Sequence, residues 1–87
     1  MADELTADEI AAHFSAMDDS VTLINETIAD DTDALKLFGD AAEVKLMMTR
    51  NTDHLEIQKE TAWYKASGKT KTKYTKAITD GKAYVAG

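Results

Sequence analysis

Apolar residues near the start of the chain recur at alternating steps of four and three residues. They are Ile10, Phe14, Met17, Val21, Ile24 and Ile28. This heptad spacing is typical of a helix that buries one face, and it predicts that Val21 and Ile24, in the middle of the seam, are buried. Immediately before the seam, Thr6 and Glu9 have the spacing of a capping box, in which each side chain accepts the other's backbone N–H. Together, these features predict a helix over about residues 7–29.

A second seam runs less regularly through the middle of the chain, after the cap-like sequence of residues 40–43. Its apolar members are Val44, Met48, Leu55 and Ala62. Asn51 and Gln58 occupy positions where an ideal seam holds apolar groups. Either these polar residues are buried and fix the register, or the helix breaks near residues 49–51. We favour one continuous helix over about residues 41–66.

Shorter elements are predicted between and after the two long helices. A short helix over about residues 34–38 follows an acidic turn. Gly68 is expected to end the second long helix in the left-handed conformation that glycine favours. The alternating lysines and threonines of residues 69–73 are compatible with a loop or with an edge strand. A last short helix over about residues 73–80 is expected to end at Gly81.

Composition supports an all-α fold. The chain has 87 residues, enough for one domain, and it contains no proline to interrupt a helix. It also contains no cysteine, so neither a disulfide nor a cysteine-based zinc site can stabilise it. We expect a single domain over residues 1–87, built as a small helical bundle or as a hairpin of the two long helices with one or two short helices.

The two halves of the chain carry opposite charge. Residues 1–44 hold 12 acids and one base, a net charge of −11, whereas residues 45–87 hold 4 acids and 9 bases, a net charge of +5. This favours contact between the acidic half and the basic half, either within one molecule or head to tail between neighbours. Alternatively, both surfaces are simply solvated, since each exposed ion pair adds little.

No group of residues indicates an active site, a cofactor or a metal ion. His13 and His54 are the only histidines, and they lie far apart in the sequence. A calcium loop of the EF-hand type starting at Asp31 would need Gly and Glu where the chain has Lys36 and Ala42. The chain has no serine–histidine–aspartate set and no glycine-rich phosphate loop that we recognise. We therefore expect a protein that is not an enzyme and that uses no cofactor or metal.

The lysine-rich end of the chain interleaves with tyrosines, as some nucleic-acid-binding surfaces do. This stretch contains no arginine, the usual reader of phosphates and bases, and the acidic half would repel phosphate. We therefore do not expect nucleic acid as a partner. The amino terminus is acidic where a signal peptide would be basic, and no apolar run approaches the length of a membrane span. Neither secretion by a signal peptide nor a membrane location is expected.

The second half of the chain also carries a resemblance to a group of known proteins. The residues concerned are 50–57 (RNTDHLEI), Trp63, 74–78 (YTKAI) and 81–84 (GKAY). With them, the stretch 50–87 resembles short proteins that tailed bacteriophages encode among their virion and assembly genes. The resemblance implies a small virion component or assembly factor, located in the virion or the host cytoplasm, and it brings no site residues with it.

These patterns favour a structural or assembly protein of a phage-like particle that acts by protein–protein association. Its partners would be other protein subunits, either copies of itself in a homo-oligomer or a larger virion protein. The heptad seam and two aromatic residues are the expected contacts, although the aromatic pair fits the lid of a small core equally well. The expected partner-binding residues are Ile10, Phe14, Met17, Val21, Ile24, Ile28, Trp63 and Tyr64.

The alternative function is inhibition of a host protein by an acidic surface that mimics nucleic acid. The acids that would supply the charge are Asp3, Glu4, Asp8, Glu9, Asp18, Asp19, Glu26, Asp30, Asp31 and Asp33. The net positive charge of the basic half argues against this function, because a mimic needs acids spread widely over its surface.

Overall fold

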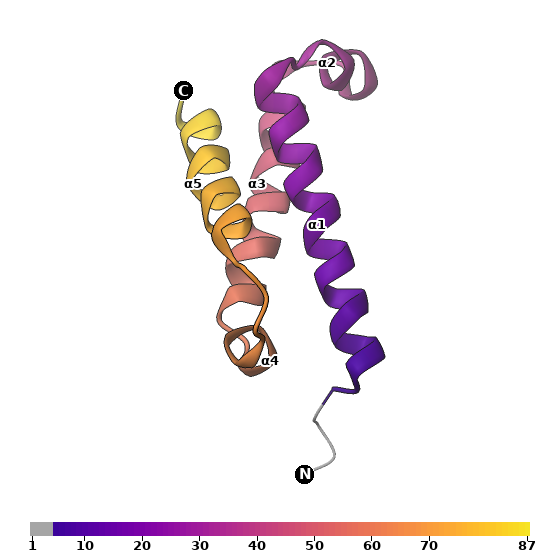
Figure 1. Ribbon diagram of the computed structural model, residues 1–87. Helices are drawn as coiled ribbons and strands as arrows, with labels where there is room; N and C mark the ends of the chain where they lie inside the picture. The colour runs from indigo at the N-terminus through magenta and orange to yellow at the C-terminus, as the bar shows by residue number, and fades with distance from the viewer. Residues whose placement is uncertain (1–4) are drawn as a thin grey trace.

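The computed structural model describes residues 5–87, and helices account for 83% of them. The elements are α1 (Ala7–Ala29), α2 (Thr32–Phe38), α3 (Ala41–Lys59), α4 (Ala62–Ala66) and α5 (Thr72–Ala86). No strand occurs in this part of the chain, so the predicted all-α class and small helical bundle are confirmed. In Figure 1, α1 and α5 run upward, α3 runs downward beside them, α2 lies at the upper end and α4 lies at the lower end.

Helix α1 begins and ends where the sequence pattern predicts. Thr6 Oγ1 accepts a hydrogen bond from the Glu9 N–H at 3.1 Å, and Glu9 Oε1 accepts one from the Thr6 N–H at 2.8 Å. The hydrogen bond from the Thr6 N–H is the main reason that the pKa of the Glu9 carboxyl lies below its ordinary value, and the Thr6 side chain adds to this effect. The backbone becomes extended at Asp30, where the helix ends. The capping box therefore sets the start of this 23-residue helix.

The core lies between α1, α3 and α5, which pack against one another (Figure 1). Val21 and Ile24 of α1 are 7% and 0% exposed, which confirms their predicted burial. The other buried apolar side chains are Phe14, Met17, Val44, Met48, Leu55, Tyr64, Tyr74, Ala77 and Ile78. At about 25 cal/mol per Å² of apolar surface removed from water, burial of this cluster is the main stabilising contribution in so small a domain. No helix within residues 5–87 has the length and apolar character needed to cross a membrane.

The predicted helix over residues 41–66 is divided into α3 and α4, so its predicted end was wrong. The chain turns at Glu60 and Thr61. Both the Thr61 hydroxyl and the Thr61 N–H donate to the Gln58 carbonyl, at 2.6 and 3.1 Å. In a continuing helix that carbonyl would accept from residue 62, so the local bonds of Thr61 compete with helix propagation. After this turn, α4 lies across the lower end of the bundle (Figure 1).

The polar residues inside α3 do not break it at residues 49–51, so continuity there is confirmed. Thr49 and Asn51 each donate a side-chain hydrogen bond to the backbone carbonyl four residues earlier, at 2.9 Å in both cases. Asn51 and Gln58 are only half-buried. The buried polar residue of α3 is Thr52, which is 3% exposed and donates to its own helix in the same way at 2.7 Å. The side chains of Thr49, Asn51 and Thr52 are therefore hydrogen-bonded within the helix.

Helix α5 is longer than predicted and does not end at Gly81. It continues to Ala86, with Gly81 buried where α5 faces α3. A Cβ atom at Gly81 would overlap with the Thr52 hydroxyl oxygen of α3. The glycine therefore permits a close approach of two helices instead of ending one of them.

The left-handed glycine is Gly39, and the prediction of that conformation for Gly68 was wrong. Gly39 has a φ of 93° immediately after α2, where any other residue would be strained. Helix α4 ends at Ala66, and the residue after it, Ser67, has an extended backbone. The stretch 69–73 forms a loop until α5 begins at Thr72, so the loop alternative holds and the strand alternative does not.

Candidate functional site

The heptad seam of α1 lies mostly within the chain's own core. Its four inner members, at most 7% exposed, are Phe14, Met17, Val21 and Ile24. Ile10 is half-buried, whereas Ile28 is 42% exposed. At 3.6 residues per turn the buried face drifts away from a strict heptad, and Thr27 takes the inner position instead of Ile28. Of the seam, Ile10 and Ile28 thus reach the surface, and a role of the seam in binding a partner stays a prediction.

Trp63 and Tyr64, both on α4, cover the lower end of the core. The Trp63 ring stacks on His13 and meets the Phe14 ring edge-on, with centroid distances of 5.1 Å in both pairs. Tyr64 is 5% exposed and packs against the rings of both Phe14 and Tyr74. Its hydroxyl has no hydrogen-bond partner in the described part of the chain, and burial raises its pKa. Both residues form an aromatic lid, while their role as anchors for a partner stays a prediction.

Hydrogen bonds join the acidic helix α1 and the residues just after it to the basic helix α5. Asp18 Oδ1 accepts from the Tyr74 hydroxyl at 2.6 Å and lies 2.8 Å from Lys73 Nζ. Partial burial favours a higher pKa for Asp18, but the bonds from Lys73 and Tyr74 outweigh it and the pKa lies below its ordinary value. Burial, together with the Asp18 carboxylate, raises the pKa of Tyr74. The Tyr84 hydroxyl likewise donates to Asp31 Oδ2 at 3.2 Å. Part of the charge asymmetry is therefore matched within one molecule.

A serine–histidine contact lies between α1 and α3, with the serine buried and the histidine half-buried. Ser20 Oγ is 2.9 Å from His54 Nδ1, and Ser20 is only 5% exposed. A nucleophile must reach its substrate, whereas this hydroxyl is enclosed between two helices. Residues 5–87 contain no group of three His, Cys, Asp or Glu residues that could hold a metal ion. This contact therefore serves to join the two helices.

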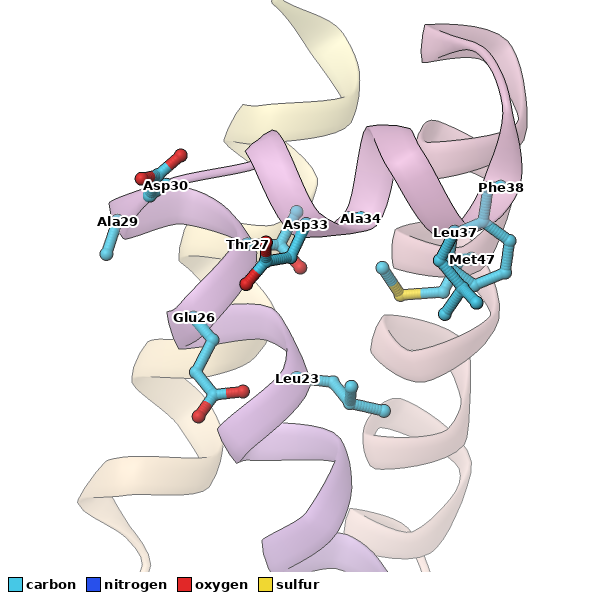
Figure 2. A pocket seen from close by; sticks show the side chains of 10 residues that line it. All are labelled: Leu23, Glu26, Thr27, Ala29, Asp30, Asp33, Ala34, Leu37, Phe38 and Met47. Carbon is cyan, nitrogen blue, oxygen red and sulfur yellow. The ribbon is translucent and has the colours of Figure 1, made fainter.

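Several exposed apolar side chains gather at the other end of the bundle, around α2. Leu23 of α1 and Leu37 and Phe38 of α2 are 44%, 79% and 40% exposed. Together with Met47 of α3 they line an open groove of about 460 Å³, in which Figure 2 shows Leu23, Leu37 and Met47 lying between the three helices. The smaller residues of the lining are Thr27, Ala29 and Ala34. The volume falls within the roughly 300–1,000 Å³ of typical ligand sites, so the groove has room for several side chains of a partner.

Three carboxylates border this apolar groove. Glu26, Asp30 and Asp33 lie on its α1 and α2 sides, and no lysine or arginine of the described chain is part of the lining (Figure 2). Asp30 Oδ1 accepts from the Thr32 hydroxyl at 2.6 Å and from the Thr32 N–H at 2.9 Å. These two bonds hold the pKa of Asp30 below its ordinary value, and the bond from the hydroxyl has the larger effect. The groove thus combines an apolar floor with a rim that is negatively charged at neutral pH.

The groove is not among the partner-binding sites predicted from the pattern, although the sequence contains a signal for it. Leu35, Leu37 and Phe38 fall within the seven residues of α2. A helix of about two turns has one face to bury, and side chains at neighbouring positions point in different directions. Leu35 is half-buried, while Leu37 remains in water. This excess of large apolar residues in a short helix is the signal that points to an exposed apolar surface.

Comparison of the chain with protein-family models, with curated proteins and with solved structures found no match. The resemblance of residues 50–87 to small phage proteins therefore stays a prediction. The functional conclusion rests on the groove around α2, its apolar lining and its acidic rim.

Proposed function

We propose that the protein is a non-enzymatic structural or assembly protein that associates with other protein subunits through the groove around α2. The observation that supports this function is the exposure of Leu37, at 79%, beside Leu23 and Phe38. Burial of a leucine side chain contributes about 1.5–3 kcal/mol, yet a small chain that needs such contributions leaves several in water at one place. Exposed apolar patches of this kind mark interaction surfaces in proteins.

The setting that we propose is a phage-like particle or its assembly in the host cytoplasm. This setting rests on the resemblance of residues 50–87 to small proteins encoded among tailed-phage virion genes. The partner is a larger virion protein or a further copy of the chain. Both kinds of partner would bury the same apolar surface, so one experiment addresses both.

Mimicry of nucleic acid has weaker support. Of the acids that such a mimic would use, Asp18 and Asp31 accept hydrogen bonds from tyrosines of α5. Two more, Asp3 and Glu4, lie outside the described residues. Carboxylates that are occupied within the chain are less available to the basic groove of a host protein, which supports association over mimicry.

Pairwise co-expression tests the proposed function. The full chain is expressed with a second, differently tagged copy and, separately, with each protein encoded beside its gene. We expect at least one complex of defined stoichiometry in size-exclusion chromatography with light scattering. Leu37→Asp should abolish that complex, because it places a charge in an apolar contact where it has no partner.

The control variant is Ala11→Asp, which adds the same charge at an exposed position near the other end of α1. It should retain the complex. Circular dichroism should show both variants folded, since Leu37 and Ala11 are exposed. The proposed function is wrong if the chain forms no complex with itself or with any neighbour, or if the complex survives Leu37→Asp.

A further inference from the structure

We propose that the groove around α2 receives an amphipathic helix with basic flanks, supplied by a different protein. This inference rests on the proposed association and specifies the partner's chemistry. Three features of the groove carry it: the shape of the apolar floor, the charge of the rim, and the carboxyl end of α1 that lies beside it.

The apolar floor fits the side chains that a helix presents on one face. Leu23, Leu37 and Met47 come from three different helices and lie around one open space (Figure 2). A helix binds such a groove by inserting apolar residues spaced at i, i+3 or i+4, and i+7. Met47 adds adaptability, because an unbranched thioether side chain can adjust to differently shaped partners.

The rim selects for positive charge on that helix. Glu26, Asp30 and Asp33 border the floor, and in the described chain no base is placed among them. Helix α1 also ends at this rim, and its last turn contains no basic residue. The carboxyl end of a helix carries a partial negative charge, so it adds to the field of the three carboxylates. Lysine or arginine beside the apolar stripe of a partner helix would complement both.

A second copy of the chain does not offer such a helix. Most of its lysines lie on α4, α5 and the loop between them, where the large side chains point into the core. The exposed large apolar residues of the described chain all lie on α1, α2 and α3: Leu23, Ile28, Leu37, Phe38, Leu46 and Ile57. Of these three helices, α1 carries five acids and no base, whereas α2 and α3 each carry as many acids as bases. None of them combines an exposed apolar stripe with a net positive charge, so the occupant is assigned to another protein.

The test uses a fluorescently labelled synthetic peptide of about 16 residues, long enough to form a helix on binding. Leucines at i, i+3, i+4 and i+7 form its apolar stripe, lysines flank the stripe, and alanines fill the remaining positions. One comparison peptide has glutamate in place of every lysine, and another has the leucines scrambled. Fluorescence anisotropy with the full chain should show the basic peptide binding at least about tenfold more tightly than either comparison peptide.

Variants of the chain test whether the peptide binds in the groove. Leu37→Asp should weaken binding of the basic peptide by about tenfold or more. Glu26→Gln combined with Asp33→Asn should weaken it by about three- to tenfold. The matched control, Asp19→Asn combined with Asp53→Asn, removes the same charge from exposed positions that are not part of the groove. It should change the affinity by less than about twofold.

Three results would overturn the inference. Equal binding of the acidic peptide would show that the rim does not select charge. Equal weakening by the two charge-removing pairs would show only a general attraction to an acidic protein. A wild-type dimer that Leu37→Asp dissociates, seen by light scattering without peptide, would identify a second copy as the occupant. That last result would leave the proposed association standing, whereas complexes that survive Leu37→Asp would remove it.

Discussion

Replacing Gly81 by alanine should destabilise the protein, although alanine is the better helix former. In an exposed helix interior the change from glycine to alanine gains about 1 kcal/mol. At Gly81 the new methyl group would overlap with the hydroxyl oxygen of Thr52 and would touch Thr52 Cβ and Cγ2 at 3.5 and 3.6 Å. The last two distances are ordinary contacts, so the clash is confined to the hydroxyl oxygen.

The Thr52 hydroxyl oxygen cannot move away from the new methyl group without a cost in free energy. It donates to the Met48 carbonyl at 2.7 Å, and Thr52 is 3% exposed. Rotating it away leaves a buried hydroxyl without its partner, which costs about 1–3 kcal/mol. Moving α5 away from α3 instead costs a similar amount, about 1–3 kcal/mol for an overpacked core. After the propensity gain of about 1 kcal/mol, we expect a net destabilisation of about 1 kcal/mol, or a Tm lower by about 4–8 °C.

Urea unfolding followed by far-ultraviolet circular dichroism measures this effect, with two comparisons. Thr52→Ala removes the clashing oxygen, so in that background Gly81→Ala should stabilise the protein by about 1 kcal/mol. Ala83→Gly makes the reverse exchange at an exposed position of the same helix and measures the propensity difference alone. If Gly81→Ala stabilises the wild-type chain as much as Ala83→Gly destabilises it, α3 and α5 do not approach closely at Gly81 and the reasoning is refuted.

Three further tests address other parts of the fold. Ile24→Ala should cost about 2–5 kcal/mol in urea unfolding, because Ile24 is fully buried, and Ile28→Ala, at a position 42% exposed, should cost much less; equal losses would contradict the placement of the seam. Tyr64→Phe should raise the melting temperature, because it removes a buried hydroxyl that has no partner in the described chain, while Tyr74→Phe should lower it by removing the donor to Asp18. The pKa of Asp18 is lowered in the fold, so its contribution is present above the unfolded value of about 4 and is lost as the pH falls through the folded value. The urea midpoint should therefore fall less on acidification in Asp18→Asn than in the wild type, and parallel curves would show that Asp18 is not paired.

The bounds of α1 could be predicted because the signals for them are local. Thr6 and Glu9 are three residues apart and satisfy each other's backbone N–H groups without help from the rest of the chain. The seam after them identifies the buried face, and Val21 and Ile24 are buried as predicted. Ile28, the last member of the seam, lies at the surface because a straight helix has 3.6 residues per turn, so the inner face rotates to Thr27.

The sequence by itself therefore determined the helical class, the first helix and the identity of most of its buried face, since these depend on neighbours within a few turns. Tertiary structure decided what happens at Gly81, which local rules assign to a helix end. Because Gly81 has no side chain, α5 can pack closely against Thr52 of α3 at this position and continue as a helix. The tertiary structure also determined that the groove exists, because Leu23, Leu37 and Met47 belong to three helices. Only the position of α2 over α1 and α3 brings them around one space.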